Sequence, residues 1–129
     1  MTVLDVDAQP WIPLSTGVSF RPIRFGPGER RQLLLRVEPG TWIPRHRHDG
    51  EVHALVLSGA RRIEGVDELI SAGTYVHEPA GNVDTWGAVG DEACVVHISI
   101  DGRMHTLRDD GDGGVVSSDG TDSLRAAYL

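Results

Sequence analysis

Residues 40–53 read GTWIPRHRHDGEVH, and this stretch decides the fold prediction. His46 and His48 are two residues apart, so on a β-strand their side chains point to the same face. His53 follows a turn-forming Asp-Gly pair, and a hairpin there would fold it back beside the first two histidines. Three imidazoles that converge inside a β-structure predict a metal site with these three histidines as ligands.

The rest of the chain predicts short strands separated by tight turns. It has 129 residues, with 16 glycines and 7 prolines. Apolar or alternating segments that end at turn-forming residues lie at 32–37, 52–57, 61–64, 74–77, 93–100 and 104–107. Many short strands of this kind are typical of a sandwich or barrel. We therefore expect an all-β fold in one domain over residues 1–129, with its core at about 11–108.

The C-terminal end predicts a different structure. Residues 109–122 are acidic and rich in glycine and serine, which predicts a surface loop. Residues 123–129 predict a short helix, with Asp122 or Ser123 as its N-cap. Because so short a helix is marginal alone, we expect it to dock on the body of the protein or on a second subunit.

Charge and composition exclude some partners. The net charge is −7, which argues against a nucleic-acid partner, because phosphate binding needs a basic surface. No apolar run approaches the roughly 20 residues of a membrane helix, and the N-terminus does not resemble a signal peptide. The single cysteine, Cys94, lies in an apolar run and is predicted to be a small buried side chain. We expect a soluble protein in the cytoplasm.

Glycine spacing places the histidines in a known frame. Residues 40–59, in which glycines flank the His-x-His pair, resemble the first cupin motif. Residues 73–84, which read GTYVHEPAGNVD, resemble the second motif, although Asp84 stands where that motif normally has histidine. The resemblance spans about residues 30–100. It implies a single cupin-type antiparallel β-barrel, or jelly roll, followed by the short C-terminal helix.

A closer resemblance points to an activity. Residues 44–59 and 76–81 look like the 2,4'-dihydroxyacetophenone dioxygenase and acetylacetone-cleaving group of small cupins. That group cleaves a carbon–carbon bond with O2 at a mononuclear non-haem metal. The resemblance implies a small enolisable diketone or hydroxyketone as substrate and favours Fe(II), while Zn(II), Ni(II) and Mn(II) also suit such ligands. His46 and His48 correspond to the first two metal ligands of the group.

The predicted ligand set is His46, His48, His53 and Asp84. It keeps three imidazoles and one carboxylate, as in many cupins, but moves the carboxylate from the first motif to the second. Asp84 is expected to complete the metal shell, to hold a ligand in place as a hydrogen-bond acceptor, or to accept a proton during catalysis. Glu51 is a rival carboxylate from the first motif.

Other side chains are expected near this site. Trp86 lies two residues after Asp84 and should share its face, so it is a candidate for the pocket wall. His97 lies in an apolar strand and could face the pocket or hydrogen-bond to Asp84. His77 and His105 have no support from a motif and are expected to be structural or exposed.

Two other functions fit the same motifs. One is a redox-neutral isomerase, cyclase or hydrolase that uses the metal as a Lewis acid. The other is a non-catalytic cupin that senses a metal or a ligand, similar to the C-terminal module of some anti-sigma factors. A homodimer is expected from the resemblance alone, because cupins often pair through sheet faces or exchanged strands.

Overall fold

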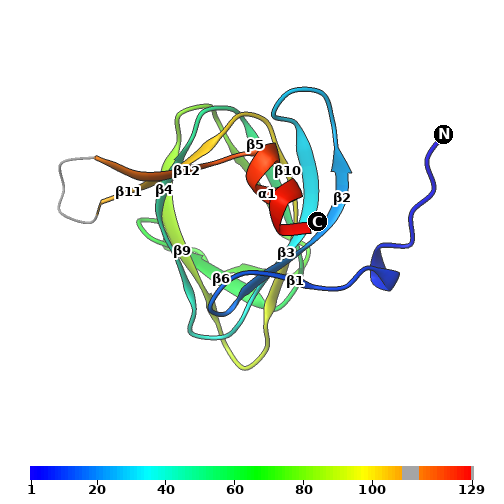
Figure 1. Ribbon diagram of the computed structural model, residues 1–129. Helices are drawn as coiled ribbons and strands as arrows, with labels where there is room; N and C mark the ends of the chain where they lie inside the picture. The colour runs from blue at the N-terminus through cyan, green and yellow to red at the C-terminus, as the bar shows by residue number, and fades with distance from the viewer. Residues whose placement is uncertain (109–113, 129) are drawn as a thin grey trace.

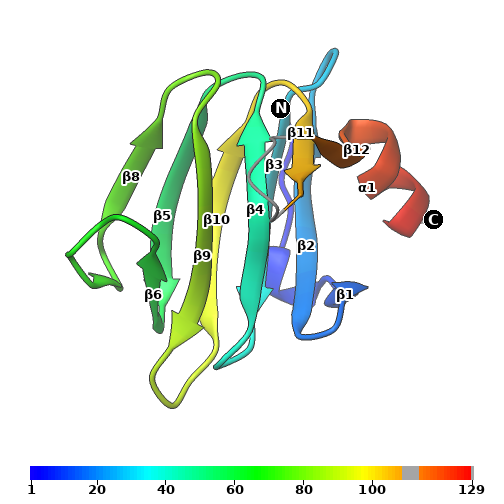
Figure 2. The ribbon, with the colours of Figure 1, turned by 90° about the vertical axis from the view of Figure 1, so that its left-hand side faces the viewer.

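The computed structural model describes residues 1–108 and 114–128, which form two facing antiparallel sheets (Figures 1 and 2). The first sheet contains, in spatial order, β1 (Ile12–Ser15), β2 (Val18–Phe25), β3 (Arg31–Val37), β10 (Cys94–Ile100), β5 (Val52–Ser58) and β8 (Tyr75–Glu78). The second sheet contains β12 (Val115–Asp119), β11 (Met104–Leu107), β4 (Trp42–His48), β9 (Val83–Val89), β6 (Ala60–Ile63) and β7 (Ile70–Ser71). A short 3-10 helix, η1 (Val6–Ala8), precedes the strands, and α1 (Thr121–Tyr128) follows them.

The prediction of an all-β jelly roll with a short C-terminal helix is confirmed. The six predicted segments match β3, β5, β6, β8, β10 and β11, with each end within one residue. The predicted loop over 109–122 needs a correction, since β12 and the start of α1 lie within it. The side chains of β12 are mostly exposed, and its backbone pairs with that of β11. The polar sequence of β12 therefore does not prevent it from forming a strand. Residues 109–113 and 129 lie outside the described residues.

Alternating side chains of the first sheet build much of the core, together with residues of the second sheet such as Trp86 and Ala88. In β5, Val52, Ala54 and Val56 are buried, while the residues between them face outward. In β10, Cys94 and Val96 are fully buried in the same cluster. The free thiol of Cys94 is therefore part of the core, as predicted.

Two strand pairs set the positions that matter for the site. In the second sheet, β4 pairs with β9, and His46 lies directly opposite Asp84. In the first sheet, β5 pairs with β8, so Val52 lies opposite Glu78 and His53 lies opposite His77. Directly opposed residues of an antiparallel pair point to the same face of the sheet. The register therefore places Val52 with Glu78 on one face and His53 with His77 on the other.

The helix α1 lies at one end of the two sheets (Figures 1 and 2). Its first backbone amide, of Thr121, donates to Glu29 Oε2 at 2.9 Å. Arg103 Nη1 lies 3.0 Å from Asp122 Oδ1 and 3.5 Å from Glu29 Oε1. An isolated helix of this length is marginal in water, so these contacts help to hold it on the sheets. Among the described residues, no helix is long and apolar enough to cross a membrane.

Candidate metal centre in the jelly-roll cavity

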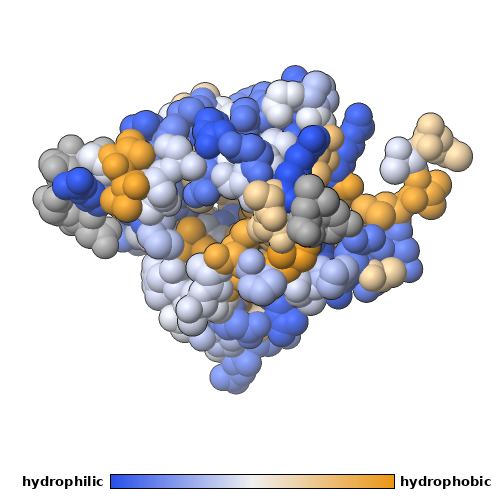
Figure 3. All heavy atoms as spheres, viewed as in Figure 1, coloured by the Kyte–Doolittle hydropathy of each residue, from blue (hydrophilic) through white to orange (hydrophobic). Residues whose placement is uncertain are grey.

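A cavity of about 510 Å³ lies between the two sheets. Figure 3 shows the molecule hollowed near its centre, with hydrophobic atoms around the opening. The buried polar side chains that line the cavity are Arg31, His46, His48, Arg61 and Glu78, and most of the remaining lining is apolar. Ser123, Leu124 and Ala127 add the inner side of α1. A cavity of this size and character suits a small-molecule ligand.

His46 and Asp84 form the centre of the polar part. His46 Nδ1 donates to the backbone oxygen of Pro44 at 2.7 Å, so its Nε2 is the atom that faces Asp84. That nitrogen lies 2.9 Å from Asp84 Oδ1, and the two side chains are only 4% and 6% exposed. Two neighbouring ligands of an octahedral ion, each about 2.1 Å from it, stand roughly 3 Å apart. The observed separation is therefore compatible with two adjacent ligands of one metal.

Mutual attraction controls the charges of this pair. Burial acts to lower the pKa of His46, but contact with the negative charge of Asp84 raises it above the ordinary value. Burial acts to raise the pKa of Asp84, but contact with His46 lowers it below the ordinary value. Without a metal, the contact therefore favours the charged form of each side chain.

His48 lies beside this pair and is neutral near pH 7. Its ring meets that of His46 edge-on, with the centroids 5.0 Å apart. Burial, followed by the positive charge of His46, lowers the pKa of His48 to about 4. Its Nδ1 is buried and has no hydrogen-bond partner among the described residues. A neutral imidazole is the form that binds metals, and an orphaned nitrogen here fits a site completed by a bound group.

Glu78 was missed as a site residue by the sequence analysis. The first cupin motif has a glutamate three or four residues after its second histidine, and here Val52 fills the inward-facing position. Glu78 lies directly opposite Val52 and is also buried, so the carboxylate of the cavity sits on the neighbouring strand. The only sequence signal was its place at the start of the Glu-Pro segment of the second motif.

The environment of Glu78 favours its protonated form. Burial raises its pKa, and the negative charge of Asp84 raises it further. Asn82 Nδ2 donates to Glu78 Oε1 at 2.9 Å, which fixes the orientation of the carboxyl group. The pKa values of the two carboxyl groups are thus shifted in opposite directions, down for Asp84 and up for Glu78.

Arg61 brings an unpaired positive charge to the cavity. It is 1% exposed, and its Nε and Nη2 have no hydrogen-bond partner among the described residues. Its guanidinium lies over the ring of Trp86, 4.7 Å from the ring centroid. Trp86 itself is buried and lines the cavity. A buried guanidinium with free donors is suited to bind an anionic oxygen of a ligand.

The structure separates two expected residues from this cavity. Between β4 and β5 the chain crosses from the second sheet to the first, and Val52 and Ala54 face the interior there. His53 therefore points outward, so the predicted set of four ligands does not assemble around one point. His97 also faces outward, with its Nε2 2.8 Å from Gln32 Nε2, and does not hydrogen-bond to Asp84.

His53 belongs instead to an exposed cluster with Glu51 and His77. Their ligand atoms all lie within 4.8 Å of one another, which is close enough to hold a metal ion. Among the described residues, no other group of three meets this criterion. The interior trio of His46, His48 and Asp84 does not meet it in this conformation, so metal binding there requires side-chain adjustment.

Comparison with known proteins identifies the family. The family model described as the ChrR cupin-like domain matches residues 1–101. The chain belongs to this family of cupins. No curated protein matches the sequence.

Solved cupin structures share the fold. An RmlC-like cupin from Ralstonia eutropha JMP134 is 24% identical, with a TM-score of 0.89 over 99% of this chain and 84% of that one. An acetylacetone dioxygenase from Acinetobacter johnsonii is 15% identical, with a TM-score of 0.82 over 100% and 90%. These likenesses confirm that this cupin resembles the acetylacetone-cleaving group in fold.

A third similar structure is the complex of Rhodobacter sphaeroides SigE with the anti-sigma factor ChrR. One chain of that complex is 28% identical to this cupin, and the two superpose with a TM-score of 0.65. The match covers 75% of this chain and 51% of that chain, so it concerns about half of the matched chain.

Proposed function

We propose that this cupin is a mononuclear metal-dependent oxygenase that cleaves a carbon–carbon bond in a small enolisable diketone or hydroxyketone. The observation that carries the proposal is that His46, 2.9 Å from the buried Asp84 and packed against His48, lies with His48 at the wall of a mainly apolar cavity. Two histidines and one carboxylate are the ligand set of many non-haem Fe(II) oxygenases. When bound, Fe(II) would supply open positions for an enolate and for O2, whereas Zn(II), Ni(II) or Mn(II) would suit the same ligands.

In this proposal Asp84 acts as a metal ligand, and Glu78 takes the part of the base. A base is most effective when its pKa lies near the working pH, and burial raises the pKa of Glu78 in that direction. Its carboxyl group lines the cavity, so in the ionised form it can receive the proton that a diketone loses on enolisation. Asn82 holds the carboxyl oxygen in place during that transfer.

Arg61 and the apolar walls complete the environment. The free donors of the Arg61 guanidinium would bind the oxygen on which the enolate charge develops. The apolar lining and the inner side of α1 exclude water, which strengthens this attraction. The cavity therefore contains a base, Glu78, for removal of the proton and a cation, Arg61, for the enolate oxygen.

Oxygen uptake tests the proposal. The metal-free protein is loaded anaerobically with Fe(II) and mixed with acetylacetone or a hydroxyacetophenone, and O2 consumption is followed with an electrode. We expect uptake in the native protein and in the control His105→Ala, and none in His48→Ala, which should also lose metal by elemental analysis. No uptake with several metals and several enolisable ketones would overturn the oxygenase proposal.

A second candidate function is favoured by the family match. The matching family model describes the cupin-like domain of ChrR. One chain of the complex of SigE with the anti-sigma factor ChrR is 28% identical to this cupin. In this alternative the cavity binds a metal or a ligand without turnover. Ligand binding that raises the melting temperature, with neither O2 uptake nor any change in the ligand, would favour it. A changed ligand without O2 uptake would favour a redox-neutral enzyme. The homodimer and the cytoplasmic location stay predictions.

A further inference from the structure

We infer that Glu51, His53 and His77 form a zinc-binding site on the outer face of the first sheet, separate from the cavity. This site does not depend on the proposed oxygenase function, because none of its residues lines the cavity. It would bind Zn(II) or a similar divalent transition metal through two imidazoles and one carboxylate.

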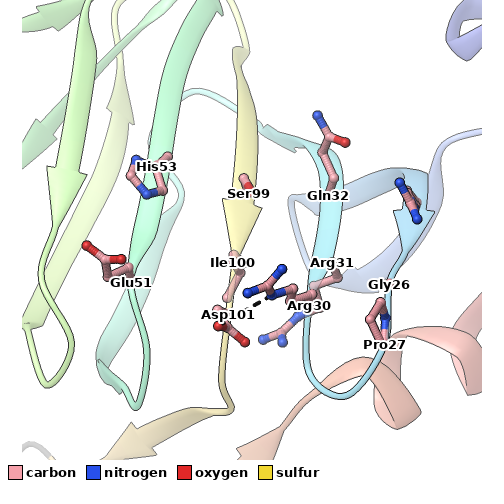
Figure 4. A pocket seen from close by; sticks show the side chains of 11 residues that line it. Gly26, Pro27, Arg30, Arg31, Gln32, Glu51, His53, Ser99, Ile100 and Asp101 are labelled. Carbon is pink, nitrogen blue, oxygen red and sulfur yellow. Dashed lines mark ion pairs between the residues drawn. The ribbon is translucent and has the colours of Figure 1, made fainter.

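Strand register brings the three residues together. His53 of β5 and His77 of β8 are directly opposed, and their ring centroids are 5.0 Å apart. Glu51 precedes His53 by two residues, and Figure 4 shows their side chains close together beside the surface groove that both help to line. Glu51 Oε1 lies 2.8 Å from His77 Nε2. Two paired strands thus hold ligands that are distant in sequence, which limits the ordering needed on binding.

A hydrogen bond orients His53 for metal binding. Its Nδ1 lies 2.5 Å from the hydroxyl oxygen of Tyr75 on β8. When the hydroxyl oxygen accepts the proton of Nδ1, the Nε2 of His53 is left with a lone pair for the metal. Histidine ligands in proteins commonly donate their other ring nitrogen to an oxygen in this way. Tyr75 therefore acts as a positioning residue for the site.

The donor types select the class of ion. Two imidazoles and one carboxylate, with a further position open to water, form a ligand set found in zinc enzymes. Mg²⁺ and Ca²⁺ prefer oxygen ligands and are poor fits. Donor atoms about 2.1 Å from a tetrahedral zinc ion stand roughly 3.4 Å apart. The ligand atoms here lie within 4.8 Å of one another, so the side chains have to move slightly closer together when zinc binds. The side chains of His77 and Glu51 are 41% and 60% exposed, so rotation can achieve this.

The chain also provides a matched control. His105 Nε2 lies 2.8 Å from Asp49 Oδ2, which is the same distance as in the pair of His77 and Glu51. No second histidine joins that pair in a metal-binding group among the described residues. If the pair of His77 and Glu51 were only a surface ion pair, the two histidines would contribute equally little to metal binding.

Calorimetric titration of Zn(II) into the metal-free full chain tests the inference. We expect His53→Ala and His77→Ala each to lose one binding event that the native protein and His105→Ala keep. The event should persist in His48→Ala, and Tyr75→Phe should weaken it by about 10-fold. Histidine-ring NMR signals provide a second readout, because zinc should shift those of His53 and His77 at this event.

Three results would overturn the inference. The first is a native protein in which zinc leaves the ring signals of His53 and His77 unchanged. The second is equal zinc stoichiometry in His77→Ala and His105→Ala. The third is loss of every binding event in a folded His48→Ala, which would assign all zinc to the cavity. Zinc binding without O2 uptake would instead contradict only the oxygenase proposal, so the two failures can be distinguished.

Discussion

Replacing Gly59, at the end of the first cupin motif, should destabilise the protein much more than replacing Gly73 of the second. Gly59 has φ +72°, and a Cβ built on it would lie 2.3 Å from the backbone oxygen of Ala93 and 2.9 Å from Cys94 Cα. Gly73 has φ +88°, but a Cβ there meets no atom within 4 Å. Both substitutions therefore impose backbone strain, but only the first forces the start of β10 to move.

The difference between the two variants isolates the clash. A left-handed conformation costs alanine about 1–2 kcal/mol, which is the whole effect expected for Gly73→Ala. Overpacking a well-packed interior adds about 1–3 kcal/mol, so Gly59→Ala should cost about 2–5 kcal/mol in total. For a domain of this size, 1 kcal/mol corresponds to roughly 4 °C in melting temperature.

Urea denaturation with EDTA present, followed by tryptophan fluorescence, measures both free energies of unfolding. The comparison is valid when the two variants and the native protein share the same m-value. Equal costs for the two substitutions, or a smaller cost for Gly59→Ala, would refute the reasoning, because the close approach of residue 59 to β10 would then be absent.

Three further predictions follow from the buried side chains. Glu78→Gln should keep metal content but slow hydrogen–deuterium exchange at the central carbon of acetylacetone by about 10²–10⁴-fold, measured by NMR. Trp86→Ala should lower the free energy of unfolding in urea by about 3–5 kcal/mol, since it empties a wall of the core. Burial raises the pKa of the Cys94 thiol from 9.0 to about 11, so iodoacetamide at pH 8 should label it only after unfolding.

The thiol also predicts a pH dependence with a definite sign. The unfolded thiol ionises near its ordinary pKa and the folded one at about 11, so the unfolded state loses its proton first as the pH rises. The free energy of unfolding should therefore fall between about pH 9 and 11, and Cys94→Ala should remove this part of the slope. Labelling of the folded protein at pH 8 would contradict the prediction for Cys94. Unchanged hydrogen–deuterium exchange would contradict that for Glu78→Gln, and a loss of less than about 1 kcal/mol in the free energy of unfolding would contradict that for Trp86→Ala.

Much of the fold could be predicted from the sequence because it depends on local signals. Turn residues divide the chain into short apolar segments, and these segments match strands of the structure. The shared face of His46 and His48 also follows from local geometry, since alternation along one strand needs no knowledge of its partners. The strand β12 was not predicted because its side chains are mostly exposed and show no buried apolar pattern, and its backbone pairing with β11 cannot be seen in the sequence.

The candidate sites were harder to predict because they depend on which face of a strand meets the core. In β5, Leu55 and Leu57 alternate with Ala54 and Val56, so apolar residues occupy both faces, and the sequence pattern does not reveal which face is buried. This ambiguity explains why His53, which lies on the outward face, was expected to face the metal site.

The sequence by itself determined the jelly roll, the shared face of His46 and His48, and the presence of Asp84 in the second motif. Only the tertiary structure decided that Glu78 and Arg61 join the two histidines in the cavity, while His53 meets Glu51 and His77 outside. The physical reason is that the two sheets face each other across one core. A side chain's chemistry then depends on the face it occupies, and strand register sets that face through contacts distant in sequence.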